Sequence, residues 1–141
     1  MLAIATKDNE TLARGASSRQ QVEFPALRDP RYPVHCIADR LEPYLRVIVE
    51  KFQPEKIILF GSYAQGNPNE HSDVDLLIIR RDVPSERQSE IEIRSAGWGL
   101  CKPPLSFTII SKTPASLQDQ IDQGSFFFSQ IVQKGLVLHA T

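Results

Sequence analysis

Hydrophobic residues recur at spacings of three and four along residues 37–52, which predicts a helix with one apolar face. Pro43 lies in the first turn of this helix or kinks it, and Pro54 predicts its end. Two short apolar runs follow, at 56–60 and 73–79, and each has the length of a buried strand. The apolar stripe of the helix consists of Ile37, Leu41, Tyr44, Leu45, Ile48 and Phe52.

Helical and extended patterns continue to alternate in the second half of the chain. In the first of these later helices, Ile91 is expected to face inward, and Trp98 with Leu100 is expected to fill the core. Helices interleaved with strands over short connections predict a single α/β (α+β) domain. The expected helices are 84–100, 113–121 and 125–135, and the expected strands are 104–110 and 136–139.

The first 33 residues show little periodicity, and three prolines lie close together in the stretch FPALRDPRYPV. We expect residues 1–33 to form a flexible or extended leader and residues 34–141 to form the folded domain. A start codon assigned too far upstream and an arm that binds a partner are the alternatives for this leader.

Composition narrows the class of protein. The chain has 141 residues, 41% of them hydrophobic and 23% charged, as in one globular domain. No apolar run approaches the roughly 20 residues of a membrane span, and the start does not resemble a secretory signal. Cys36 and Cys101 have no partner spacing, so reduced thiols and a cytoplasmic location are expected. A net charge of −1, without a basic stripe, predicts no extended nucleic-acid surface.

The stretch from Gly61 to Asp75 carries the candidate chemistry. Gly61 and Ser62 follow the strand 56–60 directly and precede what is expected to be a short helix ending near Gly66. Glycine permits close approach to the backbone, and a serine at a helix start offers its hydroxyl and neighbouring N–H groups to an anion. A phosphate group is the expected ligand.

Asp73 and Asp75 are two residues apart on a strand, so their carboxylates project from the same face. A carboxylate beside a buried sheet is costly without a cation. Oxygen ligands of this kind suit Mg²⁺, which takes one or two carboxylates, waters and substrate phosphates. A phosphate site followed by a Mg²⁺ site implies a nucleoside triphosphate such as ATP.

The pair Gly61-Ser62, followed after ten residues by Asp73-x-Asp75, resembles the hallmark of the polymerase beta-like nucleotidyltransferase superfamily, in particular its minimal (MNT type) members. The resemblance covers roughly residues 37–139 and implies a small mixed sheet flanked by helices. It implies that Gly61 and Ser62 bind the triphosphate and that Asp73 and Asp75 hold metal ions. The implied reaction transfers a nucleoside monophosphate, AMP most plausibly, to a hydroxyl of a protein or small molecule.

The chain departs from that superfamily at one position. Active members usually carry a third carboxylate early on the next central strand, where this chain has Ser106. A neutral hydroxyl there is expected to spare nucleotide binding and to weaken activation of the attacking hydroxyl. The alternative is therefore a catalytically impaired module that binds a nucleotide or a partner. Minimal members are often paired with a HEPN-type helical protein, so the resemblance also implies such a partner and an antitoxin role.

Two further groups of residues are open to interpretation. The polar residues before Asp73 could reach a nucleotide or an acceptor, although solvated loop positions are expected. Three consecutive phenylalanines cannot share one helix face, so one or two are expected in the core and the remainder at a partner or subunit contact, in preference to a platform for base stacking. These groups are Asn67, Asn69, Glu70 and His71, and Phe126, Phe127 and Phe128.

Overall fold

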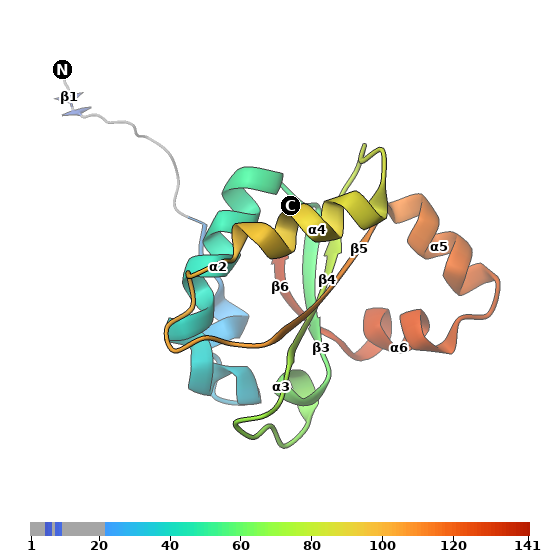
Figure 1. Ribbon diagram of the computed structural model, residues 1–141, viewed down its shortest axis with the longest axis horizontal. Helices are drawn as coiled ribbons and strands as arrows, with labels where there is room; N and C mark the ends of the chain where they lie inside the picture. The colour runs from blue at the N-terminus through green and yellow to red at the C-terminus, as the bar shows by residue number, and fades with distance from the viewer. Residues whose placement is uncertain (1–4, 7, 10–21) are drawn as a thin grey trace.

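The computed structural model describes residues 5–6, 8–9 and 22–141 (Figure 1). The short strands β1 (Ala5–Thr6) and β2 (Asp8–Asn9) pair with each other. The elements that follow are the 3-10 helices η1 (Pro25–Arg28) and η2 (Pro33–Ile37), then α2 (Ala38–Phe52), β3 (Lys56–Phe60), α3 (Ser62–Gln65), β4 (Val74–Ile79), α4 (Glu86–Ala96), β5 (Phe107–Lys112), α5 (Pro114–Asp122), α6 (Phe126–Lys134) and β6 (Leu136–Ala140). Among the described residues, no helix has the length and apolar character needed to cross a membrane.

Four strands form the main sheet in the order β5-β4-β3-β6. β3 is antiparallel to both β4 and β6, whereas β4 and β5 run parallel and are connected through α4. The sheet is therefore mixed and flanked by helices, and the predicted α/β (α+β) fold is confirmed.

Helices cover both faces of this sheet (Figure 1). On one face α2 and α4, with η1 and η2, enclose a larger core that includes Leu76 and Ile93. On the other face α5 and α6 enclose a smaller core that includes Leu77 and Leu117. Because successive side chains of a strand point to opposite faces, β4 contributes to both cores. The Asp75 side chain therefore lies on the face that α5 and α6 cover in part.

The folded domain begins earlier than residue 34. Phe24 and Leu27 are 5% and 0% exposed and belong to the larger core. Arg46 of α2 also donates a hydrogen bond of 2.7 Å to the carbonyl of Val22. The expected leader was therefore too long, because the apolar side chains of residues 22–33 complete the core. The earlier part of that leader, β1 and β2 apart, lies outside the described residues.

Side chains spaced four residues apart fasten α4 to β5. Glu90 accepts a hydrogen bond of 3.0 Å from the backbone N–H of Ser111, and Glu86 accepts one of 2.8 Å from the residue that follows β5. Arg94 donates a bond of 3.1 Å to the carbonyl of Phe107. These backbone groups lie on the outer edge of β5, so the α4 side chains occupy positions at which another strand could otherwise pair.

The rotation of α4 differs from the prediction. Ile91 is 47% exposed, and Trp98, which lies in the turn after α4 rather than on the predicted helix, is 91% exposed, so neither fills the core. Ser89 and Ile93, at 2% and 0% exposure, form the buried side of the helix instead. The prediction oriented the helix by its largest apolar residues, whereas the hydrogen bonds to β5 help to fix its rotation.

We predict that Glu90→Ala lowers the free energy of unfolding by about 1–2 kcal/mol, because the N–H of fully buried Ser111 would lose its acceptor. Urea unfolding measures this change. Glu92→Ala, on an exposed position of the same helix, is the matched control and should change stability by only a few tenths of a kcal/mol. Equal effects of the two substitutions would contradict the proposed role of Glu90.

Candidate functional site

The end of β3 and the start of β4 meet at Gly61. The strand register pairs Phe60 with Asp75, so Asp75 lies beside the point at which the chain leaves β3. Gly61 has a φ of +79°, and a Cβ placed on it would lie 2.1 Å from Oδ2 of Asp75. A side chain at this position would be strained by the backbone and would overlap the carboxylate. Glycine is therefore required for two independent reasons.

Backbone N–H groups are available next to that carboxylate, at the start of α3. The first hydrogen bonds of this short helix run from the N–H groups of Ala64 and Gln65 to the carbonyl of Gly61. The N–H groups of Ser62 and Tyr63 precede them and have no acceptor within the helix. With the Ser62 hydroxyl, they form a surface suited to an anion. An anion here would lie close to a carboxylate, so a bridging cation would relieve the repulsion.

Asp73 lies at the end of a loop with several internal hydrogen bonds. The backbone N–H of Asn69 donates to the Ser72 hydroxyl at 2.9 Å, and the Asn69 side chain accepts from the N–H of His71 at 2.7 Å. The N–H of Ser72 returns to the Asn69 carbonyl at 3.0 Å. These bonds place Asp73 at the entrance of β4. His71 and Asn69 are both exposed, and Asn69 serves the loop itself.

β5 places hydroxyl groups beside the two carboxylates. The register pairs Asp75 with Thr108, and the N–H of Val74 donates to the carbonyl of Ser106 at 2.8 Å. Ser106 therefore lies just before β5 and next to Asp73 in the register, while Thr108 is the cross-strand neighbour of Asp75. The sequence pattern indicates Ser106 and does not reveal Thr108, because sequence spacing alone does not fix the register of two parallel strands.

A cavity of about 440 Å³ opens beside Gly61 on the face that α6 covers. Phe60 and Phe127 line it and meet edge to face, with 5.7 Å between their ring centroids. Lys134 also lines the cavity, and its backbone carbonyl accepts a hydrogen bond of 2.8 Å from the side chain of Gln65. This bond ties α3 to α6 and fixes one edge of the cavity. Charge and aromatic surface therefore adjoin the turn at Gly61 and Ser62.

The three consecutive phenylalanines of α6 divide between this cavity and the core. Phe128 packs against the smaller core, as expected for one member of the group. Phe126 and Phe127 are 75% and 50% exposed and both line the cavity. The sequence did not connect them with Gly61, because about 65 residues separate the two segments along the chain and β3 pairing with β6 brings them together.

This arrangement of residues agrees with a comparison against known families. Residues 44–133 match the family model described as polymerase beta, nucleotidyltransferase. The chain belongs to this family. The matched range includes Gly61, Ser62, Asp73 and Asp75, so the predicted family resemblance is confirmed, whereas the roles of these four residues stay predictions.

Relatives of this nucleotidyltransferase-family chain occur in Methanocaldococcus jannaschii. One is 47% identical over 49 residues, which cover 33% of this chain and 33% of the relative. Another is 49% identical over 43 residues, which cover 29% of this chain and 43% of the relative. Both are named as candidate protein adenylyltransferases. The similarity thus spans less than half the length of either relative.

Electrostatics at the site disfavour two negative charges without a cation. Burial raises the pKa of Asp75, and the charge of Asp73 raises it further, while hydrogen bonding with the Thr108 side chain lowers it. Among the described residues, neither aspartate forms an ion pair with a lysine or arginine. A bound cation would reverse this pKa shift by favouring the ionised carboxylate.

The two carboxylates fit a metal ion that shares its ligands with a substrate. No group of three histidine, cysteine, aspartate or glutamate side chains within the described ranges could hold a metal ion. Mg²⁺ commonly binds one or two carboxylates together with phosphate oxygens and waters, and this family member offers such a partial set.

We predict that Asp75→Asn removes a pH-dependent loss of stability in the ligand-free protein. The folded-state pKa of Asp75 is raised, so the unfolded chain loses this proton first as pH rises above the ordinary value of 3.8. Stability from this group is present at low pH and is lost as pH rises to the folded-state pKa. The free energy of unfolding of Asp75→Asn relative to that of the parent protein should therefore be higher at about pH 7 than at about pH 4. Urea unfolding at the two pH values measures this difference.

Asp119→Asn, on an exposed position of α5, is the control for this measurement and should show no such trend relative to the parent protein. A stability difference between the parent and Asp75→Asn that does not change with pH would contradict the pKa assignment.

Proposed function

We propose that this protein transfers AMP from ATP to a hydroxyl group of another protein, in a reaction that requires Mg²⁺. The observation that supports this proposal best is the contact between Gly61 and Asp75, which joins an anion-binding turn to a pair of carboxylates. Membership of the nucleotidyltransferase family supports the reaction class. The names of the two relatives favour a protein as acceptor and adenylate as the transferred group.

Asp73 and Asp75 would hold Mg²⁺ together with phosphate oxygens of the nucleotide. The bound metal would neutralise negative charge on the phosphates and orient the attacking and leaving oxygens. The turn at Ser62 would bind phosphate through its hydroxyl and the free backbone N–H groups. The cavity beside Gly61 would take the nucleoside, with the exposed Phe126 ring available for stacking on the base.

The proposed reaction balances as a displacement at phosphorus. The acceptor hydroxyl oxygen forms a bond to the α-phosphorus of ATP, and the bond from that phosphorus to the α,β-bridging oxygen breaks. Pyrophosphate leaves with the bonding electron pair, and the hydroxyl proton passes to solvent. The residues of the chain bind and orient the nucleotide for this displacement. Asp73 is exposed, so an acceptor can approach it from solvent.

A second candidate function is nucleotide binding without efficient transfer. It is favoured by the hydroxyl groups of Ser106 and Thr108, which stand beside the carboxylates where a further acidic ligand would be possible. A neutral ligand holds a metal ion less strongly than an anionic one, and the loss affects activation of the acceptor more than nucleotide binding. As an antitoxin, such a module would mask a HEPN-type helical partner rather than modify it.

The proposed transfer predicts that a protein acceptor gains the mass of AMP when it is incubated with this protein, ATP and Mg²⁺. The first acceptor to test is the product of the adjacent gene, by intact mass spectrometry. Asp73→Asn and Asp75→Asn should each abolish the gain and weaken Mg²⁺-dependent ATP binding by at least about tenfold in calorimetry. Unchanged ATP affinity in both variants would contradict the site assignment. If the parent protein binds ATP but the acceptor gains no mass, the second function is favoured.

Adding a carboxylate to β5 should distinguish the two functions further. We predict that Ser106→Asp or Thr108→Asp raises the transfer rate about tenfold or more if a missing acidic ligand limits the reaction. Ser106→Asn and Thr108→Asn are the matched controls, since they add bulk without charge. No gain from either aspartate, with ATP binding retained, would show that a third carboxylate is not what limits turnover.

A further inference from the structure

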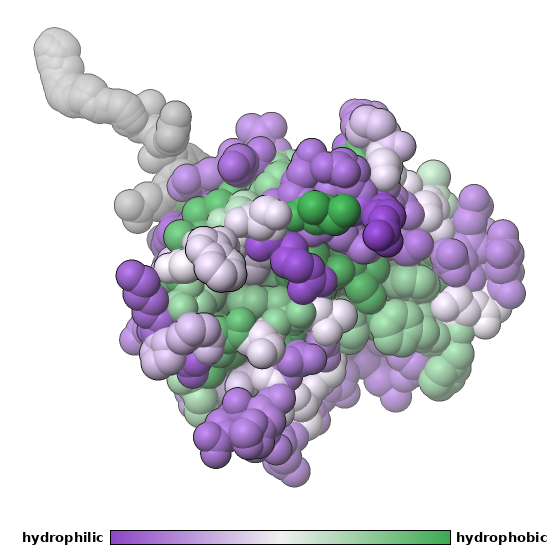
Figure 2. Space-filling view, in the orientation of Figure 1, coloured by the Kyte–Doolittle hydropathy of each residue, from purple (hydrophilic) through white to green (hydrophobic). Residues whose placement is uncertain are grey.

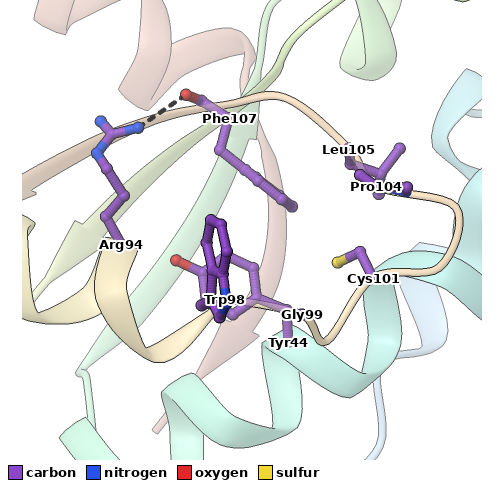
Figure 3. A pocket seen from close by; sticks show the side chains of 9 residues that line it. Tyr44, Arg94, Trp98, Gly99, Cys101, Pro104, Leu105 and Phe107 are labelled. Atoms are coloured by element: carbon purple, nitrogen blue, oxygen red, sulfur yellow. Dashed lines mark hydrogen bonds between the residues drawn. The ribbon is translucent and has the colours of Figure 1, made fainter.

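A second cavity, of about 410 Å³, lies on the opposite face of the sheet from Asp75. Figure 3 shows it between the end of α4, the segment that follows it and the start of β5. Phe107 lines this cavity, and the next residue, Thr108, is the neighbour of Asp75. Adjacent residues of a strand point to opposite faces, so the two sites share one end of β5 without overlapping. We refer to this cavity as the Trp98 pocket, after the tryptophan that borders it.

The walls of the Trp98 pocket are apolar. Tyr44 and Phe107 meet edge to face, with 4.9 Å between ring centroids, and the Tyr44 hydroxyl is already donated to the carbonyl of Ile93 at 2.7 Å. Burial raises the pKa of the Cys101 thiol, so this group stays neutral. A polar occupant would lose its hydration here without gaining hydrogen bonds from these groups. The pocket therefore suits a bulky apolar side chain.

The position of Trp98 extends this apolar surface outward. Gly97 packs so closely that a Cβ on it would lie 2.7 Å from the ring of Tyr44. The turn that begins at Gly97 leaves Trp98 91% exposed. Apolar surface is visible beneath α4 in the space-filling view, on the same side of the molecule (Figure 2). A large aromatic side chain that is exposed beside a cavity is typical of protein-binding surfaces.

The rim of the Trp98 pocket is positively charged. Arg94 donates to the carbonyl of Phe107, and Arg40 donates to the carbonyls of the two prolines before Leu105. Lys102 lies exposed on the same segment. In the described part of the chain, none of these three cations forms an ion pair with a carboxylate. Carboxylates on a partner would therefore complement the rim.

We propose that the Trp98 pocket binds the protein acceptor, by receiving one bulky apolar side chain that acidic residues flank. This inference rests on the proposed transfer, since it assigns a docking site to the acceptor of that reaction. An acceptor anchored beside Phe107 needs only a few extended residues, at roughly 3.3 Å each, to pass around the edge of β5 toward Asp75. Anchoring of this kind raises the local concentration of the hydroxyl at the carboxylates.

The test uses a short peptide with one central phenylalanine and glutamates on both sides. Trp98 is the one tryptophan of the chain, so its emission reports on this pocket directly. We expect a saturable shift of the emission to shorter wavelength with this peptide. Peptides with a central serine, or with lysines in place of the glutamates, should give no shift. Equal binding of all three peptides would overturn the proposal.

Variants of the protein show where the peptide binds. Their affinity for the same peptide, carrying a fluorescent label, is measured by fluorescence anisotropy. Trp98→Ala and Arg94→Glu should each weaken binding about tenfold. The matched controls on α4 are Ile91→Ala and Arg87→Glu, which alter exposed residues outside the pocket and should leave binding unchanged. Equal losses in variants and controls would also overturn the proposal. Laurate, a fatty acid, is added as a competitor of the labelled peptide. If laurate displaces the peptide and binds more tightly, the pocket is a lipid site and not a protein-binding site.

Calorimetry with Mg²⁺ and ATP separates this inference from the proposed function. Trp98→Ala should retain ATP binding, and Asp75→Asn should retain peptide binding. Absence of peptide binding in a protein that binds ATP would refute the docking site alone. Absence of ATP binding in a protein that binds the peptide would refute the proposed function and, with it, the acceptor role of the bound segment.

Discussion

The candidate site depends on one close contact, in which the carboxylate of Asp75 lies against the α-carbon of Gly61. The contact exists because β3 and β4 pair with Phe60 opposite Asp75, and because the chain turns at Gly61 with a positive φ. A shift of the register by one residue would turn Asp75 toward the larger core and remove it from the turn. The packing of the sheet therefore specifies the position of the carboxylate as strictly as it specifies the core.

The two faces of the sheet carry different features. One face carries the carboxylates and the cavity next to α6, and the other carries the larger core and the Trp98 pocket. β5 borders the carboxylates on one face and the Trp98 pocket on the other, because its alternate side chains point to opposite faces, and its backbone is fixed by Glu90 and Arg94 of α4. A change in the position of β5 would therefore affect both the carboxylates and the Trp98 pocket, which gives the fold a structural link between them.

Much of the fold could be predicted from periodicity, since each main helix and strand from α2 to β6 follows from the local pattern of apolar residues. The rotation of α4 could not, because Glu86 and Glu90 accept hydrogen bonds from backbone N–H groups in and just after β5 and Arg94 donates one to β5, and this orientation leaves Ile91 exposed. At the site, the spacing of glycine, serine and aspartates was enough to predict the carboxylate pair. The neighbours of this pair could not be predicted, because Thr108 is placed by the register of β4 and β5, and α6 is placed by the pairing of β3 with β6. Local sequence encodes neither.

The pair of carboxylates is held at some expense of stability in the ligand-free protein. The negative charges of Asp73 and Asp75 repel each other, and burial disfavours the ionised form of Asp75. A lysine or arginine beside them would stabilise the free protein, yet it would compete with the cation that we propose for this site. A site of this kind gains most when a cation and a phosphate arrive together, because each neutralises what the other leaves unpaired. Thr108 lies beside Asp75 and adds no third negative charge, which fits the proposed binding of a metal-nucleotide complex better than retention of a metal ion alone.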